Sequence, residues 1–131
     1  MQQERPILLV EDEGPLRTII KCNLEKRGYH VVEATSGAEA VAALRAGPPA
    51  LLLLDVNLPD MTGWDVLRTV PIDVRRAIPT IALSAVAQNP KRLHEFADVG
   101  FLHKPFPLDA LLRLVAEKVQ GEPAPGSLEV P

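Results

Sequence analysis

Short runs of apolar residues alternate with helical stretches along almost the whole chain, and this alternation is the feature that most constrains the fold. The apolar runs comprise residues 7–10, 31–32, 50–54, 79–83 and 100–103. Stretches with helical spacing or helix-capping signals follow them, at about 14–27, 37–46, 64–70, 89–97 and 108–119. Short runs that are apolar throughout are typical of strands buried on both faces. The alternation therefore predicts an α/β fold, a doubly wound (βα)5 domain with a five-stranded parallel sheet and helices on both faces.

The first helical stretch carries a clear apolar stripe. It consists of Leu16, Ile19, Ile20 and Leu24, which recur at helical spacing. The stripe predicts the face of this helix that packs against the sheet. We expect Cys22, on the same helix, to be a small core residue.

Composition restricts the class of protein further. The 131 residues, 47% of them hydrophobic, suit one domain with its own core, and the net charge of −3 argues against a nucleic-acid-binding module. A single cysteine excludes an internal disulfide, and the longest aliphatic run, residues 50–54, is too short to cross a bilayer. Because the N-terminus lacks a secretory pattern, we expect a soluble cytoplasmic protein. We assign residues 1–120 to the domain and interpret residues 121–131, with three prolines and two glycines, as a disordered tail or linker.

Polar side chains follow four of the predicted strands. Glu11 and Asp12 follow the first strand, Asp55 the third, Ser84 the fourth and Lys104 the fifth. If the strand order is 2-1-3-4-5, the first and third strands are neighbours and their three carboxylates converge. These would repel one another unless a cation neutralised them, and all-oxygen ligands suit Mg²⁺. With a lysine and a hydroxyl beside them, they predict a phosphoryl site in which a carboxylate can act as the nucleophile.

Each of these residues also has a simpler structural interpretation. The acids at 11–13 could complement the dipole of the following helix, and for Glu13 we favour that interpretation. Asp55 could form a turn, Ser84 could end a strand, and Lys104 alone could be a solvated surface lysine. The phosphoryl site is preferred because these residues together follow successive strands at one predicted edge of the sheet.

Four short segments at the ends of the predicted strands carry a family resemblance. They are Ile7–Asp12, Leu53–Pro59, Ser84–Ala85 and Lys104–Phe106. No single segment is specific, but all four occur in order and each follows the expected strand. Together they make the chain similar to the receiver domains of bacterial two-component response regulators, over roughly residues 6–119. The resemblance implies a flavodoxin-like fold with the strand order 2-1-3-4-5.

The resemblance also implies a phosphoacceptor and its metal site. Asp55 is similar to the residue that takes a phosphoryl group from a phosphohistidine, on a sensor histidine kinase or a histidine phosphotransfer protein. The implied cofactor is Mg²⁺, with Asp12 as a direct ligand, Glu11 acting through a bound water and Asn57 contributing its backbone carbonyl. Such a domain promotes its own phosphorylation and dephosphorylation and is not a conventional enzyme.

A conformational switch is the third implication of the resemblance. Lys104 would pair with the phosphoryl oxygens, and Ser84 would move to hydrogen-bond with them. Phe101 occupies the position of an aromatic residue that then turns inward, which reshapes the surface of the fourth helix, fifth strand and fifth helix. That surface would bind an output protein or a fused effector. Ser84 and Lys104 are 20 residues apart, slightly closer than is usual in the family, which puts the common dimer and effector face in doubt.

Other functions require different residues. A phosphohydrolase of the haloacid dehalogenase type needs an Asp-x-Asp motif after its first strand, where Glu11, Asp12 and Glu13 stand. A flavin-binding flavodoxin needs a loop rich in Ser, Thr and Gly at the same place. The alternative that we retain is a phosphorylation-independent pseudo-receiver that serves as a docking scaffold, although it predicts the loss of pocket residues. We expect no direct contact with nucleic acid or membrane and leave a homodimer open.

Overall fold

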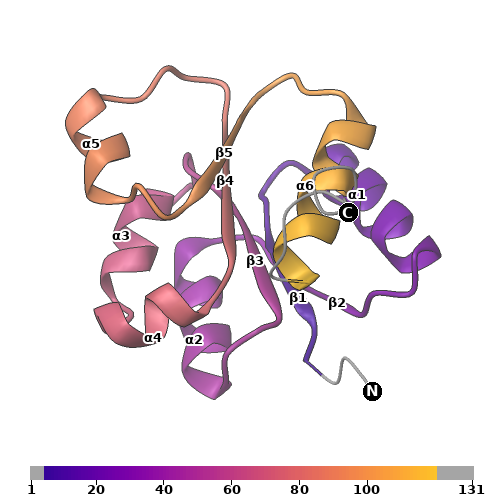
Figure 1. Ribbon diagram of the computed structural model, residues 1–131, viewed down its shortest axis with the longest axis horizontal. Coiled ribbons are helices and arrows are strands. Elements are labelled where there is room, and N and C mark those ends of the chain that lie inside the picture. The colour runs from indigo at the N-terminus through magenta and orange to yellow at the C-terminus, as the bar shows by residue number, and fades with distance from the viewer. Residues whose placement is uncertain (1–4, 121–131) are drawn as a thin grey trace, which may run out of the picture.

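The computed structural model describes residues 5–120, which form a parallel sheet between two layers of helices (Figure 1). The strands are β1 (Ile7–Val10), β2 (Val31–Ala34), β3 (Leu51–Asp55), β4 (Thr80–Ser84) and β5 (Gly100–His103). The helices are α1 (Gly14–Lys26), α2 (Gly37–Ala46), α3 (Gly63–Arg68), α4 (Ile72–Ala77), α5 (Pro90–Glu95) and α6 (Leu108–Gln120). The sheet order is β2-β1-β3-β4-β5 with every neighbouring pair parallel, which confirms the predicted fold class and strand order.

The central strands are buried on both faces. Leu9, Leu53 and Ile81 are partners in register and pack with α1 and α6 on one face. In the next row, Leu54 and Ala82 point the other way and pack with α2 and α3. Because side chains alternate along a strand, each strand contributes to two cores. Burying one such leucine contributes roughly 1.5–3 kcal/mol, so the sheet is a rigid support for the residues that follow its strands.

Helix α1 packs on the sheet as the stripe predicts, with two exceptions. Ile20 and Leu24 are fully buried, but Ile19 is 50% exposed. Cys22 is also exposed, so its prediction as a core residue is wrong. The buried positions of α1 are four residues apart, and at 100° per residue position 22 lies on the opposite side of the helix.

Two helices, α3 and α4, connect β3 to β4 where the sequence pattern predicts one. Thr62 and Asp65 form a reciprocal capping box that begins α3. Pro71 cannot donate the hydrogen bond that would continue this helix, and it serves as the N-cap of α4. Helix α4 has no buried residue, so it carries no apolar stripe that the sequence analysis could detect.

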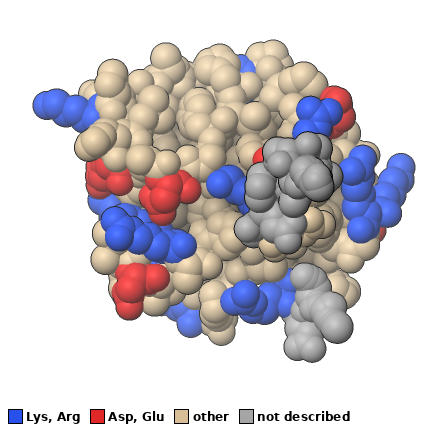
Figure 2. Space-filling view, viewed as in Figure 1, with Lys and Arg blue, Asp and Glu red and all other residues tan. Residues whose placement is uncertain are grey.

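Helix α5 is shorter than the predicted segment 89–97. Asn89 caps it by accepting a hydrogen bond from Lys91 N at 2.8 Å, and Phe96, 2% exposed, anchors its C-terminal end. A surface ion pair between Arg68 and Glu95 joins α3 to α5. Figure 2 shows the molecule from the same side as Figure 1. Charged side chains gather at the left and right of this view, and the upper part between them is largely uncharged.

Two further predictions concern the C-terminal tail and the absence of a membrane-spanning segment. The predicted tail, residues 121–131, lies outside the described residues. Among the helices of residues 5–120, none has the length and apolar character needed to span a membrane.

Candidate phosphoryl site

Strands β1 and β3 bring three carboxylates together at the carboxyl edge of the sheet. Glu11 directly follows β1, and Asp55 is the last residue of the neighbouring β3. Glu11, Asp12 and Asp55 each offer a carboxylate oxygen within 4.8 Å of the others. Glu11 is 0% and Asp55 3% exposed, whereas Asp12 is exposed. The cluster is therefore buried within the edge of the sheet and open to solvent at Asp12.

Lys104, directly after β5, supplies a positive charge to this cluster. Its Nζ lies 3.0 Å from Oε1 of Glu11 and 3.2 Å from Oδ2 of Asp55. The lysine is also fixed through its backbone, because Lys104 N donates to the carbonyl of Ser84 at 2.8 Å. One ammonium group thus bridges two buried carboxylates that come from different strands.

Burial dominates the electrostatics of the site. It raises the pKa of Glu11 to about 7, and the neighbouring charge of Asp55 acts in the same direction against the hydrogen bond from Lys104. Burial by itself would lower the pKa of Lys104, but the hydrogen bond and charge of Glu11, with those of Asp55, outweigh it and raise that pKa. One lysine does not neutralise three carboxyl groups, so the site favours a bound cation.

The donor set fits Mg²⁺. Carboxylate oxygens are hard ligands, and Mg²⁺ is commonly held by one or two carboxylates while it keeps several waters. Asn57 lies two residues past Asp55, and its backbone N donates to Oδ1 of Asp55 at 3.0 Å. An antiparallel bridge between Asn57 and Thr62 closes the loop that follows β3. This loop therefore places the predicted metal-binding backbone of Asn57 next to Asp55.

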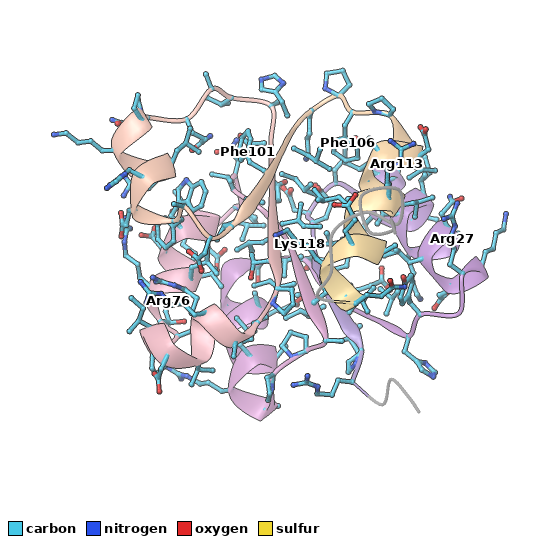
Figure 3. The ribbon with its side chains drawn as sticks, in the orientation of Figure 1. Arg27, Arg76, Phe101, Phe106, Arg113 and Lys118 are labelled. Atoms are coloured by element: carbon cyan, nitrogen blue, oxygen red, sulfur yellow. The ribbon has the colours of Figure 1, made fainter. Side chains whose placement is uncertain are left out.

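The two predicted switch residues lie on neighbouring strands. Ser84 ends β4 and is fully buried, with its hydroxyl hydrogen-bonded to Val86 and Gln88 in the following loop. Phe101 is half-buried on β5 and packs on the core under α2 and α3, whereas Phe106 packs on the opposite core beside α6 (Figure 3). The Ser84 carbonyl accepts from Lys104 N, while the Ser84 hydroxyl is hydrogen-bonded within the loop that follows β4.

A surface hollow adjoins Lys104 on the side of α1. Its volume is about 420 Å³. The lining residues are Glu13, Leu16, Ala85, Lys104, Pro105 and Phe106. The sequence analysis treats Glu13 as a helix-end acid, and the structure places it at this hollow, where its backbone N also donates to Oε2 of Glu11 at 3.1 Å.

Sequence reasoning missed two residues that position the site. Arg17 of α1 donates through Nη1 to the backbone carbonyl of Glu11 at 2.9 Å, and its Nε donates to Glu33 of β2. Gly63 lies so close to β3 that a Cβ there would meet the carbonyl oxygen of Asp55 at 2.7 Å. The two contacts join residues six and eight positions apart in the sequence, across the turns that follow β1 and β3, and neither residue type stands out in the pattern of the chain.

Comparison with known proteins agrees with this geometry. The family model "Response regulator receiver domain" matches residues 7–116. The chain is 34% identical over 128 residues to the transcriptional regulatory protein KdpE of Mycobacterium tuberculosis, covering 95% of this chain and 55% of that protein. It is 39% identical over 108 residues to the response regulator receiver protein CpdR of Brucella abortus, covering 81% of this chain and 89% of that protein.

A solved receiver-domain structure is also similar to this chain. The receiver domain of the sensor histidine kinase PA1611 from Pseudomonas aeruginosa, which carries a magnesium ion coordinated in its active-site cleft, superimposes with a TM-score of 0.77 at 30% identity. The alignment covers 90% of this chain and 99% of that domain. This chain belongs to the response regulator receiver domain family. It spans about half the length of the transcriptional regulators that it matches.

Proposed function

We propose that this domain accepts a phosphoryl group on Asp55 and thereby switches a surface that binds an output partner. The observation that carries the proposal is the convergence of Glu11, Asp12 and Asp55 around the ammonium group of Lys104. Mg²⁺ would be held by these three carboxyl groups, with Glu11 acting through water, and by the backbone carbonyl of Asn57. When bound, it would supply the positive charge that offsets the negative charge of the phosphoryl oxygens.

The phosphoryl donor is a phosphohistidine of a sensor histidine kinase or a histidine phosphotransfer protein. An oxygen of Asp55 attacks the phosphorus atom, the phosphorus–nitrogen bond breaks, and the imidazole nitrogen leaves with the bonding electrons. The product is an acyl phosphate on Asp55, whose hydrolysis by water later restores the carboxylate. Lys104 pairs with the phosphoryl oxygens throughout, and the donor approaches from the side on which Asp12 is exposed to solvent. The domain is thus a phosphoacceptor that assists its own modification and not a conventional enzyme.

The switch follows from the new negative charge beside Ser84 and Phe101. A phosphoryl group adds strong acceptor oxygens at a place that Lys104 already fixes. Contacts that favour one of two loop packings by a few kcal/mol are sufficient to shift the population. We propose a protein partner or a fused effector in the cytoplasm as the recipient of the signal, because the net charge of −3 disfavours binding of nucleic acid by this domain itself.

Intact-mass analysis after incubation with acetyl phosphate tests this function. The wild-type chain should gain one phosphoryl group in the presence of Mg²⁺ and none without it, and Asp55→Asn should gain none. If no adduct forms, beryllofluoride, an acyl-phosphate mimic that cannot be hydrolysed away, separates two explanations. Bound beryllofluoride would indicate rapid self-dephosphorylation, whereas no binding would reject the phosphoacceptor function and favour the docking scaffold.

A further inference from the structure

We propose that Gln88 is a positioning residue that restrains Ser84 before phosphorylation and couples its movement to Trp64. Gln88 lies in the loop between β4 and α5, half-buried, and its side-chain amide contacts residues on both sides. No motif or spacing in the sequence predicts a role for Gln88. Because Ser84 responds only if Asp55 is phosphorylated, this role rests on the function proposed above.

The hydroxyl group of Ser84 has no hydrogen-bonding capacity left in this structure. It donates to the carbonyl of Val86 at 3.1 Å and accepts from Val86 N at 3.0 Å and from Nε2 of Gln88 at 3.1 Å. A serine hydroxyl has one donor and two acceptor positions, so all three are occupied. Ser84 must therefore break its bond to the Val86 carbonyl before it can donate to a phosphoryl oxygen.

Trp64 fixes the orientation of the Gln88 amide. The indole nitrogen of Trp64 lies 2.9 Å from Oε1 of Gln88, and an indole N–H can only donate. The carbonyl oxygen of Gln88 therefore faces Trp64, and its NH2 group faces Ser84 and the Val86 carbonyl, the latter at 2.8 Å. This fixed amide stabilises the present position of the Ser84 hydroxyl and opposes its departure.

The other end of this connection reaches α5. The ring of Trp64, 4% exposed, stacks on Phe96 with centroids 4.9 Å apart and an interplanar angle of 19°. The guanidinium groups of Arg68 and Arg75 lie over the Phe96 ring at 5.5 and 4.9 Å. Helix α5 itself has no buried residue, so Phe96 at its end is its main anchor. A change at Ser84 that moves Gln88 and Trp64 would therefore also move Phe96, the buried residue at the C-terminal end of α5.

Two readouts test this coupling separately. Trp64 is the only tryptophan, so intrinsic fluorescence reports on it alone, while ¹⁹F NMR detects bound beryllofluoride directly. In the wild-type chain with Mg²⁺, Trp64 emission should change along the same titration curve as the bound fluorine signal. Gln88→Leu removes the restraint, so half-saturation should occur at a beryllofluoride concentration about two- to tenfold lower, the range for one neutral hydrogen bond. The emission change should also be smaller.

A second variant and a control exclude a general effect on folding. Trp64→Phe keeps an aromatic ring against Phe96 but removes the indole donor, so it should lower the midpoint in the ¹⁹F titration in the same direction. Gln120→Leu, at an exposed position on α6, should match the wild type in both readouts. The coupling would be overturned if Gln88→Leu and Trp64→Phe bound beryllofluoride with the wild-type midpoint and Trp64 emission in the wild type stayed constant during the titration. That result would leave the proposed function intact. Absence of any bound fluorine signal in the wild type would instead overturn the proposed function and, with it, the coupling.

Discussion

Lys104 Nζ lies 3.0 Å from Oε1 of Glu11, although the two residues are 93 positions apart and follow strands that are separated by β3 and β4. The bond therefore forms only when the whole sheet is assembled. It places a positive charge against a fully buried acid at the point where β1 ends, next to Asp55. At the carboxyl edge of the sheet, one ammonium group is thus shared between two of three clustered carboxyl groups, an arrangement that favours a further cation.

The stability of the metal-free protein should fall as the pH rises from about 5 to 8. Burial raises the pKa of Glu11 to about 7, above the value near 4.3 of an unfolded glutamate. The folded state thus binds the proton more tightly, so this contribution is full below about pH 4.3 and is lost as the pH rises through 7, by up to about 4 kcal/mol. Urea unfolding of wild type and Glu11→Gln at several pH values checks this. The variant should show a flatter profile, and equal slopes would contradict the buried acid.

Lys104→Met should separate metal binding from recognition of the phosphoryl group. Removing a positive charge from a cation site should leave Mg²⁺ affinity unchanged or raise it. The same change removes a charged partner of the phosphoryl oxygens, so beryllofluoride affinity should fall roughly ten- to hundredfold. Calorimetric Mg²⁺ titration and ¹⁹F NMR measure the two affinities, with Lys91→Met on exposed α5 as the matched control. A parallel loss of both affinities would mean that Lys104 supports the fold of the site and not the phosphoryl group.

Gly63→Ala should destabilise the protein and disturb the site together. The added Cβ would lie 2.7 Å from the carbonyl oxygen of Asp55 and 3.1 Å from Cα of Val56, and backbone atoms cannot move aside easily. Overpacking of this kind costs about 1–3 kcal/mol. Gly14→Ala is the control, because a Cβ there meets nothing within 4 Å, and it should change stability by less than about 1 kcal/mol. Equal unfolding midpoints for the two variants would show that the approach of Gly63 to β3 is not tight.

Asp60→Ala should weaken the connection between the loop after β3 and helix α2. The carboxylate of Asp60 accepts from the backbone N of Gly37 at 2.7 Å and of Ala38 at 2.9 Å, and these bonds lower its pKa. Its contribution to stability is present above the unfolded pKa near 3.9 and is lost as the pH falls through the lower folded value. The variant should therefore unfold more easily than the wild type near neutral pH, with a difference that narrows in acid. Asp98→Ala, at an exposed turn, provides the comparison, and a pH-independent difference would contradict the capping role.

The sequence predicts the sheet well because its signals are local. Each apolar run indicates a strand, and the residues after the first, third and fifth runs locate the edge at which Glu11, Asp55 and Lys104 meet. Helix α4 escapes prediction because it lies on the surface without an apolar stripe. The contact of Trp64 with Gln88 also escapes prediction, since it depends on how α3 packs against the loop that follows β4, and no spacing along the chain records that.

The central claim is that Asp55, and no other acid in the cluster, receives the phosphoryl group, and borohydride reduction tests it most directly. After incubation with acetyl phosphate and Mg²⁺, reduction converts an aspartyl phosphate to homoserine, which tandem mass spectrometry locates in the peptide. We predict homoserine at position 55 and unmodified side chains at Glu11 and Asp12. A reduced residue at position 11 or 12, or an adduct on a histidine with Asp55 unchanged, would contradict the assignment of Asp55 as the phosphoacceptor.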